Sequence, residues 1–370
     1  MGLLDLVDIR FTSPQDTGIT MGSRGVVALV LKDVADAVGH YEVNTARQVS
    51  TKLSSVSEKN KQYVKLALKG ALGIAPLAVH VFVTEAIEST ELSTENAAFT
   101  EIGTGPYDYI AVPGASATEA KAIAEWVADV NKDGDHVKKV VLSGAAANDQ
   151  HVINFMAEDI KTKDGDFTAA EYAARVASYI AALPPTQSIT YKELPEVISV
   201  KPYSKKVLDE KAKSGELHLY NDGQAVRFAS GVNSLSKAGT GQNESFGQIK
   251  ETEIMDMLKN DIKRALLDKY IGRYSNSYEN KLLLVTEIKS YLEAFERRGL
   301  LEPGESDVRI DFEAQKDYLR EIGYKTRDGR KVDAMTPEEV YKGNTRKKVF
   351  LRMRVLVLGA IESITVVVEV

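Results

Sequence analysis

Residues 107–142 read YDYIAVPGASATEAKAIAEWVADVNKDGDHVKKVVL, and this stretch decides the class of fold. Tyr107–Val112 and Lys139–Leu142 are short apolar runs of the kind that form buried strands. Between them, Ser116 and Glu119 have the spacing of a capping box, which begins a helix. The apolar residues that follow recur on one helical face: Ala120, Ile123, Ala124 and Val127. Strand, helix and strand in this order predict a layered α/β domain.

The same rhythm continues on both sides of this stretch. Gly25–Leu31 and Ala78–Thr84 are further apolar strands, and residues 57–69 have a helical pattern. Downstream, Thr168 and Glu171 form a second capping box. Asn221-Asp222-Gly223 has the turn chemistry of a β-hairpin. The pattern as a whole predicts a mixed α/β (α+β) fold.

A change of composition at residues 234–246, which are rich in Ser, Gly, Asn and Thr, indicates the main domain boundary. Beyond it, apolar residues recur every four positions: Ile254, Leu258, Ile262, Leu266 and Tyr270. This spacing predicts an amphipathic helix that ends near Gly272. Three later helices are expected. One ends at Gly299, the next begins at the cap Asp311, and the last begins at Thr336-Pro337. We therefore expect a separate C-terminal part made of helices and a sheet.

Both ends of the chain have the alternation of β-strands, which is unusual for termini. The alternating apolar residues are Val7, Ile9 and Phe11 near the start, Leu351, Met353, Val355 and Val357 within 349–358, and Ile364, Val366, Val368 and Val370 at the end. Two interpretations follow. These strands pair inside their own subunit, or they add to the sheet of another copy by β-augmentation. Periodicity alone leaves both open.

Composition excludes several classes of function. A net charge of -6 and a pI near 5.6 argue against a direct nucleic-acid partner, which needs a concentrated basic face. With no cysteine, thiolate chemistry and disulfides are excluded. The start, MGLLDLVDIRF, has acidic residues in its apolar run and is not a secretory signal, and no stretch reaches the length of a membrane helix. We expect no membrane insertion.

The motifs that carry chemistry are incomplete. Asp129–Gly134 resembles the first half of a calcium loop, but the twelfth position is Val140 instead of Glu. Two Gly-Thr-Gly segments, at 103–105 and 239–241, lack the context of a phosphate-binding loop, and the histidines form no i, i+4 pair. We therefore predict no catalytic, cofactor-binding or metal site, and this favours a structural role.

The segment Tyr341–Arg354 carries six cations and no acid. It forms either a solvated face or a patch that meets an acidic partner.

Taken in order, short stretches along most of the chain resemble the tail sheath proteins of contractile phages and phage-tail-like bacteriocins, in particular the short type from Gram-positive bacteria. The stretches are Gly25–Asp33, Tyr107–Gly114, Phe167–Arg175, Leu194–Val197, Asn221–Gly223, Gly231–Leu235, Glu253–Met257, Phe312–Gln315 and Lys348–Leu351. The resemblance implies a non-enzymatic subunit without cofactors. It implies copies of the chain in six-membered rings, stacked helically around a tail tube, with baseplate and tail terminator proteins as further partners. The polymer is expected in a virion tail or phage-tail-like particle, assembled in the cytoplasm of a bacterial host.

The resemblance also assigns roles to residues. It implies an N-terminal arm at 1–20, an N-terminal domain at 21–95, a central α/β domain at 96–245, a C-terminal domain at 246–358 and a C-terminal arm at 359–370. The arms would insert into the sheets of neighbouring copies through Val7, Ile9 and Phe11 and through Ile364, Val366, Val368 and Val370. The receiving sheet would contain Leu351, Met353, Val355 and Val357, and the candidates to face the tube are Lys259, Lys263 and Arg264.

Other classes of function remain as alternatives. The strand–helix rhythm is also compatible with a cytosolic α/β nucleotide-binding protein or enzyme. A tail tube or baseplate component is disfavoured by the length of the chain and by its helical C-terminal part. The resemblance leaves open whether the particle is an infectious phage, a bacteriocin or another injection device.

Overall fold

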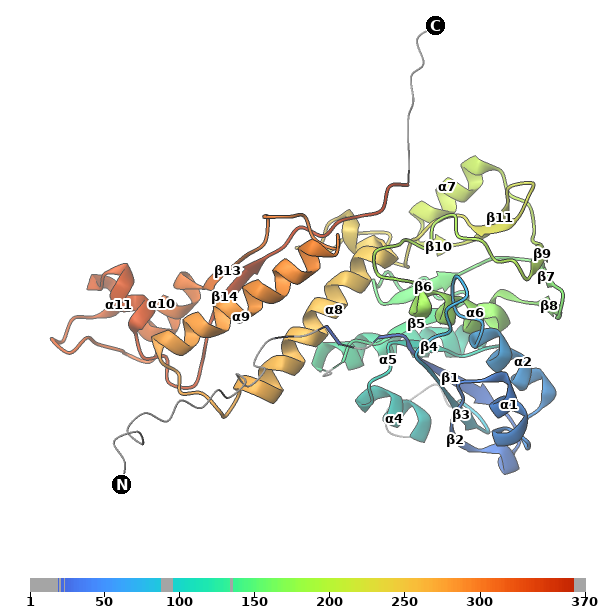
Figure 1. Ribbon diagram of the computed structural model, residues 1–370, viewed down its shortest axis with the longest axis horizontal. Coiled ribbons are helices and arrows are strands. Elements are labelled where there is room, and N and C mark those ends of the chain that lie inside the picture. The colour runs from blue at the N-terminus through green and yellow to red at the C-terminus, as the bar shows by residue number, and fades with distance from the viewer. Residues whose placement is uncertain (1–18, 20, 23, 88–95, 134–135, 363–370) are drawn as a thin grey trace, which may run out of the picture. The chain divides into compact units, whose positions relative to one another are not determined.

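The chain is described by a computed structural model that covers residues 19, 21–22, 24–87, 96–133 and 136–362 (Figure 1). Its contacts divide the chain into two compact units. The large unit consists of Gly22–Asn260 with Val357–Val370, and the small unit of Met1–Met21 with Asp261–Leu356. Each unit is described by itself below.

A seven-stranded mixed sheet forms the centre of the large unit, in the order β10-β6-β5-β4-β1-β3-β2. All neighbouring strands are parallel except β2 and β3, which are antiparallel. The strands are β1 (Val26–Lys32), β2 (Gly39–Glu42), β3 (Ala78–Thr84), β4 (Tyr109–Ala111), β5 (Lys139–Leu142), β6 (Val152–Phe155) and β10 (Glu216–Leu217). The α/β layer predicted from the sequence is therefore confirmed. Strands from both sides of the domain boundary expected between residues 95 and 96 belong to this same sheet.

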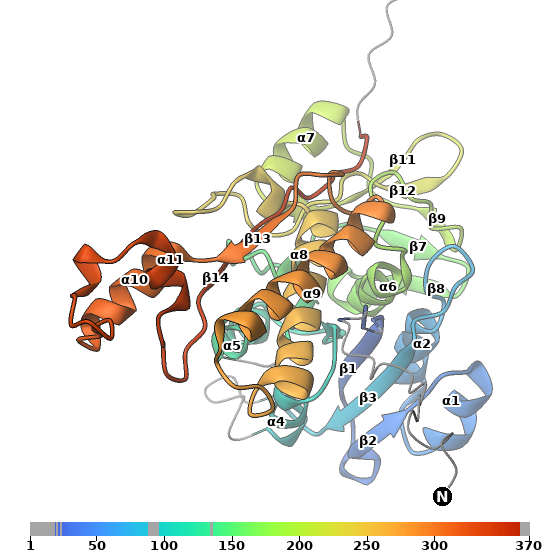
Figure 2. The ribbon, with the colours of Figure 1, turned by 60° about the vertical axis from the view of Figure 1, so that its left-hand side comes forward.

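Helices cover both faces of the sheet, which explains why its strands are apolar throughout. On β1, Val27, Leu29 and Leu31 belong to one core, whereas Ala28 and Val30 belong to the other. The first core is closed by α1 (Ala46–Lys52), α2 (Glu58–Ala67) and α6 (Ala169–Ala182), and the second by α4 (Ala97–Thr104) and α5 (Ala117–Asp133) (Figure 2). The result is a three-layer arrangement.

Both predicted capping boxes are present and start the helices as expected. Ser116 Oγ accepts from the Glu119 amide (3.3 Å), and Glu119 Oε2 accepts from the Ser116 amide (2.7 Å). Thr168 and Glu171 make the equivalent pair at the start of α6. Each pair satisfies amide groups that a helix start would otherwise leave without a partner.

Smaller elements complete the large unit. An antiparallel sheet contains β7 (Ile160–Thr162), β8 (Gly165–Phe167) and β9 (Val197–Ser199), and the predicted hairpin is formed by β11 (Leu219–Asn221) and β12 (Val226–Phe228). In its turn, Gly223 has a φ of 93°, a conformation that favours glycine. The remaining elements are α7 (Lys205–Lys213), the 3₁₀ turns η1 (Ala35–Ala37) and η2 (Glu244–Gly247), and the first part of α8 (Ile249–Ala265).

The small unit is mainly helical. After the end of α8 and a π-helical turn, η3 (Leu266–Tyr270), it contains α9 (Tyr278–Arg297), α10 (Phe312–Glu321), the 3₁₀ turn η4 (Val332–Ala334) and α11 (Pro337–Lys342). Its two strands, β13 (Asp307–Ile310) and β14 (Leu351–Arg354), form a two-stranded antiparallel sheet beside α9 (Figure 1). Asp311 caps α10 as predicted, and Gly272, Gly299 and Gly323 follow helices with positive φ.

The strand expected across residues 349–358 is shorter than predicted. β14 ends at Arg354, so that Leu351 and Met353 lie in the strand while Val355 and Val357 lie outside it. The physical reason is the length of its partner, because β13 offers only four residues for pairing. Beyond the strand, the Glu302 amide donates to the Leu356 carbonyl (2.9 Å).

Candidate assembly surface and buried charge cluster

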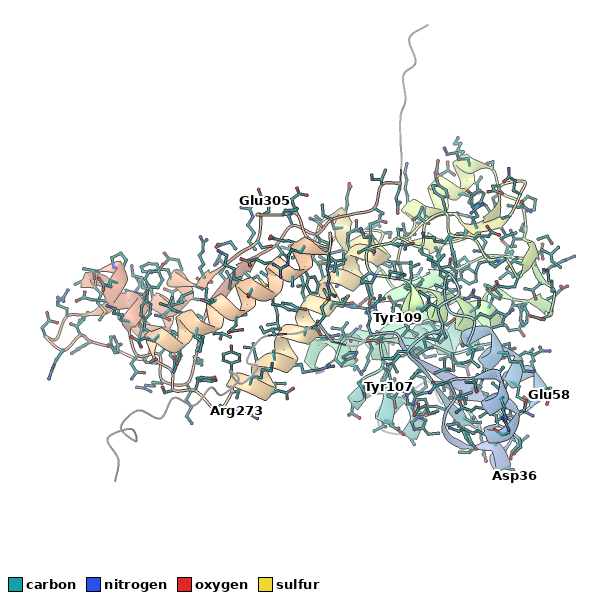
Figure 3. The ribbon with its side chains drawn as sticks, viewed as in Figure 1. Asp36, Glu58, Tyr107, Tyr109, Arg273 and Glu305 are labelled. Carbon is teal, nitrogen blue, oxygen red and sulfur yellow. The ribbon has the colours of Figure 1, made fainter. Side chains whose placement is uncertain are left out.

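A cluster of buried charges in the large unit joins α8 to the sheet. Glu253 of α8 lies at its centre. Its Oε1 accepts from Arg24 Nε (2.9 Å), and its Oε2 accepts from the hydroxyl of Tyr109 (2.5 Å), which Figure 3 labels, and from Lys139 Nζ (3.0 Å). Lys139 and Glu253 are both less than 5% exposed. Each of these charges is thus paired, which is the condition for burying charges without a large penalty.

The cluster continues one helical turn further along α8. Asp256 Oδ2 lies 3.3 Å from Lys139 Nζ, and Asp256 Oδ1 lies 3.2 Å from His151 Nε2. The other ring nitrogen of His151 lies 3.4 Å from Asp149 Oδ1. One turn later, Asn260 Oδ1 accepts from the Val137 amide (3.0 Å). Residues at three successive turns of α8 therefore contact the segments that lead into β5 and β6.

These contacts move the pKa values of the groups involved. Burial alone would raise the pKa of Glu253, but the charges of Arg24 and Lys139 lower it to about 2. Burial would lower the pKa of His151, but hydrogen bonds to Asp149 and Asp256 raise it to about 9. For Lys139, the charges of Glu253 and Asp256 outweigh burial and raise the pKa. Glu253, His151 and Lys139 are therefore charged at neutral pH.

The arrangement fixes α8 instead of carrying out chemistry. Each acid has a permanent cationic partner, so none is free to exchange a proton with a substrate at neutral pH. The sequence analysis missed this cluster. Its only signal is that charged residues interrupt apolar patterns. Lys138 and Lys139 do so at the start of the buried β5, and Glu253 and Asp256 do so on a helix that is otherwise apolar on that side.

The small unit presents the surface that the sequence analysis assigned to assembly. In the β13–β14 sheet, Val308 is opposite Met353 and Ile310 is opposite Leu351. Val308 and Ile310 are buried, whereas Met353 remains 42% exposed. Within the described residues, β13 and β14 pair only with each other, so the outer edge of β14 has open backbone groups.

A groove lies beside the start of β14, within the small unit. Its volume is about 420 Å³, and the residues that line it include Tyr270, Ile271, Tyr274, Val349 and Leu351. Ile271 is 65% exposed, and the buried Tyr270 hydroxyl has no hydrogen-bond partner among the described residues. Arg273 and Glu305, at opposite edges of this unit in Figure 3, lie in the turns after η3 and before β13.

The other predicted site residues are placed as follows. Lys259 and Arg264 on α8 are exposed, and Lys263 is half-buried. All seven predicted arm residues lie outside the described residues: Val7, Ile9, Phe11, Ile364, Val366, Val368 and Val370. The roles of arms, receiving sheet and tube contact therefore stay predictions.

A cavity of about 670 Å³ in the large unit does not form a phosphate site. Three cations are among the residues that line it: Lys69, Lys163 and Arg175. Two of them are already paired, Lys69 with Asp164 (3.0 Å) and Arg175 with Glu196 (2.5 Å). The cavity thus lacks the concentrated positive charge that a nucleotide needs. Among the described residues, no group of three His, Asp or Glu side chains is arranged to hold a metal ion, and none of the helices there could span a membrane.

Comparisons with known proteins identify the family. Residues 85–234 match the model of the phage tail sheath protein central domain, and residues 241–370 match that of the phage tail sheath C-terminal domain. The tail sheath protein of Clostridium phage phiCD119 is 30% identical over 369 residues, which cover 98% of both chains.

Solved structures share the fold at lower identity. The helical sheath of the anti-feeding prophage in its contracted state has a TM-score of 0.70 at 15% identity, over 100% of this chain and 99% of that chain. The sheath of an extracellular contractile injection system, also contracted, has a TM-score of 0.68 at 11% identity, over 98% and 96%. The sheath tail protein from Desulfitobacterium hafniense has a TM-score of 0.67 at 16% identity, over 82% and 93%.

The two matched domains and the full-length relative agree with the open sheet edge of the small unit and with a large unit whose buried charges serve structure and not catalysis. The chain belongs to the phage tail sheath protein family and is a structural subunit, not an enzyme, of a contractile sheath in a phage tail or phage-tail-like particle.

Proposed function

We propose that copies of this subunit assemble into six-membered rings stacked around a tail tube and hold one another by exchanged β-strands. On triggering, the polymer contracts and drives the tube through the envelope of the target cell. Baseplate and tail terminator proteins contact its two ends. One solved relative is a subunit of the anti-feeding prophage baseplate assembly, which supports a baseplate contact for this subunit.

The observation that carries the proposal is the incomplete sheet of the small unit. A two-stranded sheet has only marginal stability by itself. An open edge with unpaired backbone groups and exposed apolar side chains can pair with a strand from another chain. Met353 and Leu351 line such an edge in a member of a family that forms polymers. Strands added from other copies would complete this sheet by β-augmentation.

The residues that lead to the proposed C-terminal arm are held on the large unit. Lys250 Nζ donates to the carbonyls of Leu358 and Gly359 (2.9 Å each). Glu362 Oε1 then accepts from the hydroxyls of Ser188 (2.9 Å) and Thr190 (2.6 Å). We infer that the free arm begins after Glu362, a few residues later than Gly359, where the sequence analysis began it.

Exchanged strands suit a polymer that changes shape. Backbone pairing between an arm and a neighbouring sheet can persist while the rest of each subunit moves as a rigid body. Energy stored during assembly, as a kinetically trapped extended state, would then be released without a nucleotide. Lys259, Lys263 and Arg264 on α8 remain our candidates for the contact with the tube.

Truncation of the arm tests the proposal. A chain that stops after Glu362 is expected to fold with the thermal midpoint of the full-length subunit but to form no tubes when co-expressed with its tail tube protein, as judged by negative-stain electron microscopy. Normal tubes from the truncated chain would refute the strand exchange.

Two point variants provide a matched pair, because they add the same charge one residue apart. Val366→Lys would place a charge in the apolar row of the proposed arm strand, whereas Thr365→Lys would place it on the opposite face of that proposed strand. We expect Val366→Lys to block tube formation and Thr365→Lys to permit it. Equal assembly of both would contradict a strand with one buried face.

A further inference from the structure

A basic loop, Asn344–Lys348, lies between α11 and β14 in the small unit. Its residues Arg346, Lys347 and Lys348 are consecutive and exposed. Within the described part of the chain, neither Arg346 nor Lys347 has an acidic partner, while Lys348 Nζ lies 4.7 Å above the ring of Tyr318. Three adjacent cations thus face solvent without local neutralisation.

The loop is held in one shape by the half-buried side-chain amide of Asn276. Asn276 Nδ2 lies 3.0 Å from Thr345 Oγ1, 3.0 Å from the Arg346 carbonyl and 2.9 Å from the Lys348 carbonyl. Thr345 is fully buried, and its hydroxyl donates to the Lys348 carbonyl (2.5 Å). Such a loop loses little freedom on binding, so its charges are in place before a partner arrives.

Arg346 adopts a conformation that is unfavourable for its side chain. Its φ is 55°, in the left-handed region that glycine occupies more easily. A strained non-glycine residue persists only where its surroundings enforce it, and such residues concentrate at functional sites. Here the residue in this conformation is the first of the three cations.

The charge of the chain is divided unevenly between the two units. Residues 1–21 with 261–356 contain 22 Lys and Arg against 20 Asp and Glu, a formal charge of +2. Residues 22–260 with 357–370 contain 25 Lys and Arg against 33 Asp and Glu, a formal charge of -8. A polymer of such subunits gains by placing the basic part of one copy against the acidic part of the next.

We propose that the basic loop docks on the acidic large unit of a neighbouring copy and fixes how successive subunits meet. The inference rests on the proposed polymerisation and adds to it a contact that involves neither arm. Because the two surfaces are different, the contact is heterologous, the type that generates open helical assemblies. Charge complementarity would set the register and speed of assembly, and the arms would hold the assembled product.

Charge reversal in the loop tests this directly. The variant Arg346→Glu/Lys347→Glu is compared with Lys325→Glu/Arg327→Glu, which removes two exposed cations of the same unit and changes the net charge equally. The full-length chains are co-expressed with the tail tube protein, and the sheath that sediments with tubes is measured at low and high salt. We expect the loop variant to lose at least about tenfold and the control to stay within about twofold of wild type.

A third variant separates charge from folding. Arg346→Gly removes the cation but relieves the left-handed strain, so its thermal midpoint is expected to equal or exceed that of wild type while sedimentation falls. Wild-type sedimentation of the loop variant would overturn the inference, as would an equal loss in both double variants. If wild type forms no polymer although both proteins are folded, the proposed function fails and the inference fails with it.

The partner is identified by zero-length crosslinking with a carbodiimide, which joins a lysine amine to a carboxylate in direct contact. We expect links from Lys347 or Lys348 to acids within residues 22–260 in the polymer and not in the free subunit. Links that run instead to the tube protein, or that are the same in both samples, would contradict docking on a second copy.

Discussion

The two units of this subunit differ in how completely each encloses its own sheet. In the large unit, Glu253 is buried with Arg24, Lys139 and Tyr109 around it, and the central sheet is covered by helices on both faces. In the small unit, two four-residue strands pair only with each other among the described residues. Met353 and Ile271 remain exposed there.

This difference separates what must be stable in one subunit from what is completed by others. A buried charge cluster tolerates no missing partner, so it belongs in a part that folds by itself. An open strand edge and an exposed apolar groove are liabilities in a monomer, and proteins keep them where an interface will cover them. This difference supports the proposal that the large unit is the self-sufficient body and that the small unit carries the assembly surface.

The largest effect on stability is expected when the carboxylate at the centre of the charge cluster is removed. Glu253→Ala leaves Arg24 and Lys139 buried with less compensation, and it should lower the free energy of unfolding by about 3–5 kcal/mol. Urea unfolding of the free subunit measures this. The exposed Lys259→Ala on the same helix is the control and should change stability by less than about 0.5 kcal/mol. Similar small effects for both would show that the cluster does not hold α8.

A smaller effect is expected from His151, through pH. Its pKa is raised from 6.5 to about 9 by Asp149 and Asp256 against the effect of burial. A group with a raised pKa stabilises the folded state fully below its unfolded pKa and loses that contribution as pH rises through the folded value. Stability of wild type should thus fall by about 1–2 kcal/mol between pH 6.5 and 8.

The variant His151→Gln isolates this contribution, because it should abolish most of that slope. The interval ends at 8 since burial lowers the pKa of Lys138 to about 8, and this group adds an opposite trend above that pH. Equal slopes for wild type and variant in urea unfolding would contradict the assignment.

Much of the fold follows from local patterns in the sequence. Capping boxes at Ser116 and Thr168 and the turn at Asn221-Asp222-Gly223 act over a few residues, so they could be recognised without a structure. Short strands such as β2 and β6 were missed, because four residues carry too little periodicity to stand out. The length of β14 depends on β13, a partner about 40 residues away, and could not be predicted from its own alternation.

The candidate sites also differ in whether a local sequence pattern could reveal them. The apolar rows of both chain ends are visible as patterns, and they suggested strand exchange. The charge cluster joins residues 24, 109, 139, 151, 253 and 256, which only the tertiary fold brings together. The rigidity of the basic loop depends on Asn276, almost 70 residues from Thr345. Long-range pairings of this kind have no local signal.

The smallest effect on the free subunit is expected at Met353. Because its side chain is 42% exposed, Met353→Lys should change the free energy of unfolding of the monomer by less than about 0.5 kcal/mol. In co-expression with the tail tube protein, the same variant should assemble poorly, because the added charge would be buried under a neighbouring strand. A clear loss of monomer stability would show that Met353 belongs to the core of its own subunit.

Hydrogen exchange of the free subunit and of the polymer tests the central claim most directly. We predict that the amides of β5 are protected in both samples, whereas the amides of Leu351–Arg354 that point away from β13 exchange quickly in the free subunit and become protected in the polymer. The same exchange of β14 in both samples, or a change at β5 as large as that at β14, would contradict the division into a self-sufficient body and an assembly surface completed by other copies.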